Sequence, residues 1–285
     1  MGRSLGKARA RIDALVAAGL DEINYSTGDE HVKYVPLDHL INAIIAAAER
    51  NFSVHIMVEL RKERSVTAHS IRNHERIRAL PSELRDLIFP KESPWMPTDP
   101  MRFNKYPPGI ATDRENLCNA KGCDSVLQTY VLQADGRIGS CCGLGMRITP
   151  ELNVAPAEGD DFLMRAIEEA ESDFLKVWIH YLGTEKILAW AAEKNPNIKW
   201  EGLYAHNCQA CLRIYKDPAV GEVIREHYQE MVGEVLQAVW LDEEYIPQQM
   251  EKAIPGITAS QGIVVHKINR APSQITDSNG RRVRI

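Results

Sequence analysis

The chain has 285 residues, of which 44% are hydrophobic and 26% are charged, so it can bury one large core or two smaller ones. Its formal net charge of -5 argues against a general nucleic-acid-binding protein, because neutralising phosphates requires a basic surface. The sequence has no apolar run of signal-peptide type and no uninterrupted apolar stretch near the ~18 residues of a membrane span. We therefore expect a cytoplasmic protein that binds neither nucleic acid nor membrane.

The first part of the chain alternates between predicted helices and predicted strands. Apolar spacing predicts a helix over 6–19 and another over 37–51. Short segments of β-forming composition predict strands over 20–27 and 52–60. Helices and strands that alternate with short connections indicate an α/β fold with a parallel sheet.

The pattern becomes less regular after the second predicted strand. Residues 67–90 are expected to be helical, in two pieces. Residues 89–112 contain six prolines, which predicts a loop or linker. We place a domain boundary within this proline-rich segment, near 95–112.

The remaining part of the chain is predicted to be mainly helical. Residues 159–195 have a helical pattern that is interrupted around Gly183, and another helix is expected over 220–240. Residues 207–220 are expected to form a loop between them. A short apolar run at 262–268 predicts an edge strand.

Six cysteines lie in this second part of the chain. In a reducing compartment, cysteines are metal ligands or buried thiols more often than disulfides. The segment "SVLQTYVLQADGRIGSCC" predicts a β-hairpin with its turn at "DG", and such a hairpin would bring two of these cysteines together. The six are Cys118, Cys123, Cys141, Cys142, Cys208 and Cys211.

The spacing of the cysteines predicts a four-thiolate site. Cys123 and Cys141 flank the predicted hairpin, and Cys208 and Cys211 form a C-x-x-C pair whose sulfur atoms can face one ion or cluster. Two locally preorganised pairs can together complete such a site. Three interpretations stay open from the residues alone: unliganded buried thiols, a structural zinc ion and an iron–sulfur cluster.

Two further cysteines compete for a place in this site. Side chains alternate along a strand, so Cys141 and Cys142 are not expected to point the same way. One of the two is expected to be a ligand and the other to pack elsewhere. Cys118 and Cys142 are therefore candidates for a fifth or a replacing ligand.

The cysteine-rich part of the chain resembles the auxiliary-cluster extension, of SPASM or twitch type, found in radical S-adenosylmethionine proteins. Cys123, twelve residues, Gly136, four residues and Cys141 fit the C-x(9–15)-G-x4-C signature of that extension. The downstream Cys208 and Cys211 stand where the family completes its cluster. The resemblance implies an auxiliary [4Fe–4S] cluster that relays an electron or anchors a substrate, with zinc as the alternative.

The first part of the chain is similar to the middle of the radical barrel in the same family. "GLDEINYSTGDEHVKYVP" resembles a barrel strand with its loop, and "VHIMVEL" resembles the next strand. Together the two resemblances cover about residues 5–215. They imply a partial (β/α) barrel over 1–100, a small α+β auxiliary-cluster domain with a β-hairpin and helices over 101–218, and a C-terminal helix and tail over 219–285.

The barrel resemblance also implies a ligand site at the ends of the strands. Ser26 and Asp29 stand where family members contact S-adenosylmethionine or the substrate, and parallel α/β folds bind ligands at the carboxyl ends of their strands. Glu59 and Arg61 end the next strand and could meet the same ligand. An ion pair on the rim of the sheet is the alternative for these two side chains.

The chain departs from the family in one respect. The C-x3-C-x2-C motif that holds the catalytic cluster is absent, and Tyr204 stands four positions before Cys208. We therefore expect that the N-terminal half of the barrel is missing from this sequence, is supplied by a protein partner, or has lost its chemistry. The expected substrate is a small molecule or a peptide, and the chain alone is expected to be inactive. The alternative function is a non-catalytic adaptor that binds zinc or an iron–sulfur cluster.

Overall fold

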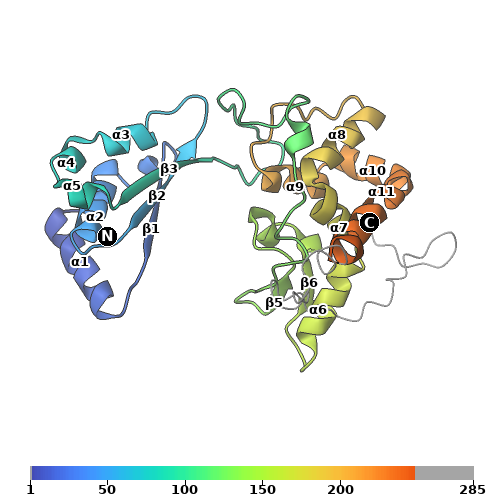
Figure 1. Cartoon of the computed structure of the whole chain (residues 1–285), viewed down its shortest axis with the longest axis horizontal. Coiled ribbons are helices and arrows are strands. Elements are labelled where there is room, and N and C mark those ends of the chain that lie inside the picture. Colours follow the sequence, from blue (N-terminus) through green and yellow to red (C-terminus); the bar gives the residue numbers. More distant parts are fainter. Residues whose placement is uncertain (1, 248–285) are drawn as a thin grey trace. The chain divides into compact units, whose positions relative to one another are not determined.

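The computed structural model describes residues 2–247, which form two compact units (Figure 1). The first unit consists of the residues up to Met96 together with Asn104–Ile110. The second unit consists of Pro97–Phe103 and the described residues from Ala111 onward. Each unit has a hydrophobic core of its own. None of the described helices combines the length and the apolar composition needed to cross a membrane.

The first unit contains a three-stranded parallel sheet with the strand order β1-β2-β3. Helices precede the sheet and form both crossovers, so all three carboxyl ends lie at one edge of the sheet. The strands are β1 (Ile23–Thr27), β2 (Val54–Leu60) and β3 (Ile88–Pro94), and the helices are α1 (Leu5–Ala17), α2 (Leu37–Ala48), α3 (Ala68–Arg72), α4 (Glu75–Arg78) and α5 (Ser82–Arg85).

The helices of the first unit gather on one side of this sheet, and the core lies between them and the strands (Figure 1). Val54 and Ile56 of β2 point into the core, whereas His55 and Met57 between them are exposed. This alternation follows from the two-residue period of a strand. The sheet therefore has one face packed against helices and one face that the described residues leave open.

The sequence correctly predicts the first four elements of this unit, but the prediction for β3 is wrong. We expected a helix that ends near residue 90 and then a proline-rich loop, whereas β3 pairs with β2 along its whole length. Pro90 and Pro94 are tolerated because, in the described sheet, β3 is an edge strand and can lack the outward N–H groups. The fold is mixed α/β, and the described strands form an open sheet instead of a closed barrel.

The second unit contains a small antiparallel sheet of β4 (Val131–Leu132), β5 (Arg137–Gly139) and β6 (Asn153–Pro156). The hairpin of β4 and β5 is the predicted one, and its turn contains Gly136 at a φ of +81°, a conformation that favours glycine. The third strand, β6, was not expected from the sequence. It pairs with β5 through a bulge next to Ile138 and Gly139.

The described part of the second unit also contains six helices, of which α6 packs against β6. The predicted interruption at Gly183 is confirmed, because this glycine has a φ of +92° and a Cβ atom there would lie 2.3 Å from the carbonyl oxygen of Lys121. The helices are α6 (Phe162–Glu171), α7 (Phe174–Leu182), α8 (Thr184–Lys194), α9 (Asn207–Lys216), α10 (Pro218–His227) and α11 (Gln229–Trp240). The short helical turns are η1 (His31–Lys33), η2 (Leu117–Asn119), η3 (Leu144–Arg147), η4 (Pro150–Leu152) and the π-helical η5 (Leu241–Tyr245).

The described C-terminal part differs from the sequence prediction in two places. Residues 207–220 do not form a loop: α9 begins with the C-x-x-C pair, because its buried side chains Leu212 and Ile214 pack into the core. The single helix expected over 220–240 is divided into α10 and α11, whose core side chains belong to the second unit. The strand expected over 262–268 lies outside the described residues.

Candidate functional site

The hairpin side of the cysteine site is fixed against α7. The backbone N–H of Cys123 donates to the carbonyl oxygen of Ile179 at 3.1 Å, and Nδ1 of His180 lies 2.9 Å from the carbonyl oxygen of Cys123. At the base of the hairpin, the N–H of Leu127 donates to the carbonyl oxygen of Ser140 at 3.2 Å. These bonds hold Cys123 beside the strand that leads to Cys141.

The two adjacent cysteines have different surroundings. Cys141 is only 4% exposed and belongs to the core, whereas the Cys142 side chain is exposed. Cys142 is held by Ser125, whose hydroxyl oxygen accepts from the N–H of Cys142 at 2.8 Å and lies 3.2 Å from its sulfur atom. Alternation along the backbone thus directs one thiol inward and the other outward.

The helix side of the site is the first turn of α9. Cys208 and Cys211 are three residues apart, so their side chains lie on neighbouring positions of one helical face. His206 caps this turn, because its Nδ1 accepts a hydrogen bond of 3.2 Å from the N–H of Cys208. The cap fixes where the helix begins and therefore where the two thiols stand.

The hairpin and the helix bring their thiols together around Gly143. A Cβ atom at Gly143 would lie 3.0 Å from the sulfur atom of Cys208 and 3.9 Å from that of Cys141. Burial, with smaller contributions from the negative charges of Cys208 and Cys123, raises the pKa of Cys141 to about 11, although a hydrogen bond with the backbone of Gly143 opposes the shift. Burial also raises the pKa of Cys211 well above its ordinary value, and Cys141, Cys208 and Cys123 add to that shift. Four thiols from two distant segments are therefore within electrostatic range of one another.

The four thiols are not preformed as a site for a single metal ion. Among residues 2–247, no group of three or more His, Cys, Asp or Glu side chains is arranged so that it could hold a metal ion. A tetrahedral zinc ion requires all four sulfur atoms at about 2.3 Å from one point. The four thiols thus share one region but do not have the spacing of ligands to a single ion. Cys118 is exposed on η2 and is not among the thiols that shift the pKa of Cys141 or Cys211.

A cavity of about 480 Å³ lies along α9. Tyr215, one turn beyond Cys211, lines it, and the hydroxyl of Tyr215 is buried with no hydrogen-bond partner among the described residues. The ion pair of buried Lys176 with half-buried Asp173 also lines it. Burial, followed by the negative charges of Asp173 and Cys211, raises the pKa of Tyr215 well above its ordinary value. Charged side chains that include Glu151, Glu169 and Arg225 also line this cavity, so its lining is more polar than that of a typical small-molecule site.

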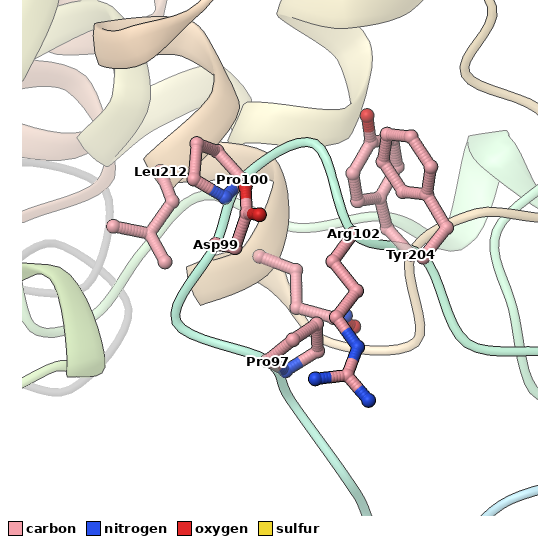
Figure 2. Close-up of a pocket in the computed structure, with 8 residues that line it drawn as sticks. Pro97, Asp99, Pro100, Arg102, Tyr204 and Leu212 are labelled. Carbon is pink, nitrogen blue, oxygen red and sulfur yellow. The ribbon is translucent and has the colours of Figure 1, made fainter.

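A second hollow of this unit lies between α9 and the segment Pro97–Phe103 (Figure 2). It has essentially no room for a water molecule. Nearby, the guanidinium of Arg213 lies 5.5 Å from the ring centre of Phe103 and donates to the hydroxyl of Tyr204 at 2.6 Å. The hollow is therefore a packing seam that anchors α9, and it has no space for a ligand.

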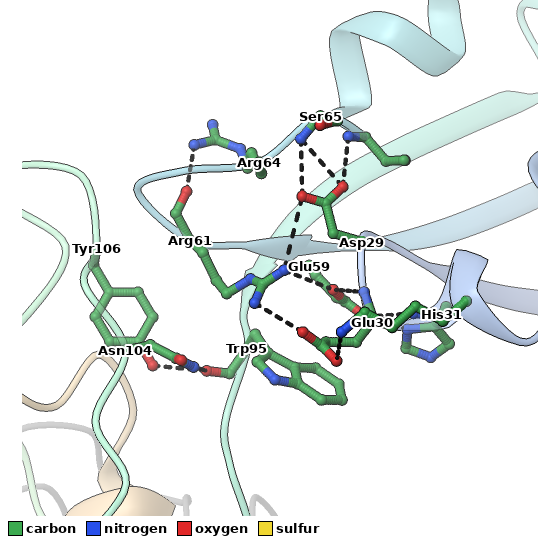
Figure 3. Close-up of polar contacts among 12 residues, drawn as sticks. Asp29, Glu30, His31, Glu59, Arg61, Arg64, Ser65, Trp95, Asn104 and Tyr106 are labelled. Carbon is green, nitrogen blue, oxygen red and sulfur yellow. Dashed lines mark hydrogen bonds and ion pairs between the residues drawn. The ribbon is translucent and has the colours of Figure 1, made fainter.

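The predicted ligand site of the first unit is a network of polar contacts at the carboxyl ends of β1 and β2 (Figure 3). The Asp29 carboxylate accepts from the N–H groups of Ser65 and Val66. Arg61 donates to Glu30 at 3.0 Å and lies 3.7 Å from Asp29. Arg61 therefore forms ion pairs on the rim of the sheet, which was the alternative to a ligand-binding role for this side chain. The contacts of Asp29 order the loop after β2.

Glu59 occupies the centre of this network. Its carboxylate is 4% exposed and accepts from the N–H of Glu30 at 2.9 Å and from the N–H of His31 at 3.1 Å. Gly28 makes this close approach possible, because a Cβ atom there would lie 2.3 Å from the Glu59 side chain, and its φ of +149° suits glycine.

His31 is the functional candidate that the sequence did not single out. Its Nε2 lies 3.1 Å from the hydroxyl oxygen of Ser26, and its Nδ1 contacts the Glu59 carboxylate. Ser26 and His31 are five residues apart, whereas Glu59 comes from the next strand. The only signal in the sequence was the polar loop "STGDEH", which does not reveal its partner on β2.

Neither the comparison with protein-family models nor the comparison with curated proteins finds a match for this chain.

Proposed function

We propose that the second unit binds an iron–sulfur cluster through Cys123, Cys141, Cys208 and Cys211, and serves as an auxiliary-cluster unit of radical S-adenosylmethionine type. One observation supports this proposal above all: a hairpin and a distant helix bring their thiols together around Gly143. The convergence involves the four cysteines that the resemblance selects. Cys118 and Cys142, the two exposed cysteines, are the candidates for a minor role.

The resemblance is what favours an iron–sulfur cluster over a single zinc ion, because Cys123, Gly136 and Cys141 fit the C-x(9–15)-G-x4-C signature of the auxiliary-cluster extension. A zinc ion bound by the same four thiolates is the alternative. The apolar core around Cys141 would also shield a cluster from water, which is one determinant of its potential.

The role of such a cluster would be to relay an electron or to anchor a substrate. A candidate place for that substrate is the cavity beside α9, which Ile214 and Tyr215 line about one turn beyond Cys211. Tyr215 can hydrogen-bond to a ligand there, and the ion pair of Lys176 with Asp173 can orient a polar one. A small polar molecule or a peptide side chain fits this set of groups.

The proposal gives the first unit a supporting role in binding S-adenosylmethionine or substrate. The exposed hydroxyl of Ser26 and the partly exposed guanidinium of Arg61 are available at the strand ends. The carboxylates of Asp29 and Glu59 accept backbone N–H groups and would act by shaping the loops. Because the chain lacks the C-x3-C-x2-C motif, radical chemistry would require that motif to be supplied upstream of this sequence or by a protein partner.

Anaerobic reconstitution of the full chain with iron and sulfide tests this proposal. We expect a brown protein with near-stoichiometric iron and inorganic sulfide. Cys208→Ser should lose most of the bound iron, because this thiol faces Gly143 at the centre of the site. Cys118→Ser is the matched control and should keep its iron, since Cys118 is exposed and outside the group.

The same experiment contains the outcomes that contradict the proposal. A colourless protein that retains zinc under these conditions would support the adaptor alternative. Equal iron content in the Cys208→Ser and Cys118→Ser proteins would show that the four thiols are not the ligands.

A further inference from the structure

The geometry points to a second site: we propose that Ser26, His31 and Glu59 form an acyl-transfer triad on the first unit, in place of the supporting role in S-adenosylmethionine binding considered above for Ser26. Ser26 is the nucleophile, His31 is the general base, and Glu59 orients the imidazole. This site shares no residue with the four-thiol group of the second unit, so it can fail or succeed separately from the proposed cluster.

The contacts of His31 carry the proposal. Its two ring nitrogens have different partners: Nε2 faces the Ser26 hydroxyl at 3.1 Å, and Nδ1 contacts the Glu59 carboxylate. In serine hydrolases of unrelated folds, a histidine lies between a serine and a carboxylate in this way, and the site is recognised by this geometry instead of by sequence order. With Nδ1–H bonded to Glu59, Nε2 carries the lone pair that can accept the serine proton.

The carboxylate is held in place more firmly than an ion pair on a surface would be. Glu59 is buried and accepts the backbone N–H groups of Glu30 and His31, so it cannot rotate away from the imidazole. The ring of Trp95 packs edge-on against the His31 imidazole at a centroid distance of 5.7 Å, and this contact restricts rotation of the imidazole. A fixed base–carboxylate pair is the part of a triad that preorganises the reaction.

The nucleophile lies where a substrate can reach it. Ser26 is exposed at the carboxyl end of β1, which is the edge where α/β sheets bind ligands. In the described sheet β1 is an edge strand, so no further described strand covers its outer side.

The open face of the sheet indicates the class of substrate. Ser26 of β1 is in register with Met57 of β2, which is 59% exposed. His55 of β2 is in register with Phe89 of β3, which is 36% exposed. An apolar acyl chain can lie on these side chains while its carbonyl carbon reaches Ser26. The substrate class is therefore an ester or thioester of a short apolar acid.

The reaction is a two-step acyl transfer. The Ser26 oxygen forms a bond to the carbonyl carbon while His31 takes the serine proton. The ester C–O bond, or the thioester C–S bond, then breaks, and the leaving group receives that proton from His31. Water then attacks the carbonyl carbon of the acyl-serine while His31 takes a proton from the water. His31 returns that proton to the Ser26 oxygen as the free acid leaves.

Labelling with a fluorophosphonate probe tests the triad on the full-length chain. Phosphonylation should occur at Ser26, as located by mass spectrometry of the modified peptide. His31→Gln should slow this labelling by at least about 100-fold, the usual contribution of a general base. Ser82 is the matched control serine of the same unit. It is exposed, and its hydroxyl donates to the Glu83 carboxylate at 3.1 Å, but the described contacts give it no histidine that could act as a base.

A fold control separates loss of the base from loss of structure. Far-ultraviolet circular dichroism of His31→Gln should match that of the unaltered chain, and a second variant, Glu59→Gln, should slow labelling while Ser26 stays in place. Labelling of Ser26 no faster than that of Ser82, or unchanged labelling in the folded His31→Gln protein, would overturn the proposal.

Discussion

Gly143 is the residue that determines how closely the two thiol pairs approach. It has an ordinary backbone conformation, with a φ of -76°, so its importance does not come from backbone strain. A side chain at this position would instead occupy the space between the sulfur atoms of Cys208 and Cys141. The absence of a side chain is therefore a feature of the site itself.

Replacing this glycine tests that role. Gly143→Ala should reduce the iron bound after reconstitution several-fold, because the new methyl group would lie 3.0 Å from the Cys208 sulfur atom. The melting temperature of the iron-free protein should change little. Gly233→Ala is the control, since nothing lies within 4 Å of a Cβ atom at Gly233, and its iron content should be unchanged. Full iron content in Gly143→Ala would contradict the assigned position of the site.

Tyr204 gives the second unit a stability that depends on pH. This side chain is 1% exposed, and burial raises its pKa to about 12 from the ordinary 10.0, although Arg213 opposes the shift. Between pH 10 and 12 the unfolded chain loses this proton while the folded chain keeps it. The free energy of unfolding should therefore fall as pH rises through this range, by up to about 1.4 kcal/mol per pH unit.

Urea unfolding of the unaltered chain and of Tyr204→Phe checks this dependence. The variant loses the hydrogen bond from Arg213, so it should be less stable below pH 10. Its free energy of unfolding should decrease less steeply between pH 10 and 12, because phenylalanine does not ionise. Parallel curves for the two proteins would show that Tyr204 does not titrate as described.

At the scale of elements, α9 connects the fold to the candidate site. His206 caps its first turn and thereby fixes Cys208 and Cys211. His206→Ala should cost about 1 kcal/mol in the free energy of unfolding and should lower iron retention. His206→Asn, which restores a capping side chain, should recover most of both. Lower iron retention in His206→Asn, at unchanged stability, would instead indicate that His206 is itself a ligand.

The elements also show which parts of the fold can be predicted from sequence and which cannot. The pattern of apolar residues predicts α1, α2, β1 and β2 correctly: β2 alternates between buried and exposed side chains, whereas α2 is an apolar run whose residues 40–48 are all buried. The strand β3 was missed because its prolines indicate a loop, and only its place at the edge of the described sheet makes them acceptable. A local pattern does not contain that information.

The site could be predicted in part for the same reason. The four cysteines were identified from spacing, but the segment 207–220, which carries two of them, was expected to be a loop and contains α9, because tertiary packing decides the state of a short polar segment. Ser26 and Glu59 were identified at the ends of their strands. His31 was not, because its partners depend on the loop that Gly28 turns over Glu59.

At the scale of the whole molecule, the two units carry separate candidate sites. Each unit has its own core, and the described four-thiol group lies entirely in the second one. A cluster that binds only the folded second unit should therefore stabilise that unit alone. This expectation distinguishes a local cofactor from a general effect of iron on the chain.

Hydrogen exchange with and without the reconstituted cluster measures this difference. Amide groups of α9 and of the β4–β5 hairpin should exchange more slowly in the loaded protein. Amide groups of β2 in the first unit should exchange at an unchanged rate. Equal protection in both units would contradict a cluster confined to the second unit.

X-ray absorption at the iron edge of the reconstituted full-length protein tests the central claim most directly. If the four thiols hold a cluster, the iron atoms have only sulfur neighbours in the first shell and other iron atoms in the second shell. Cys208→Ser should remove this signal, and Cys118→Ser should leave it intact. A first shell of oxygen and nitrogen, without an iron neighbour, would contradict the account.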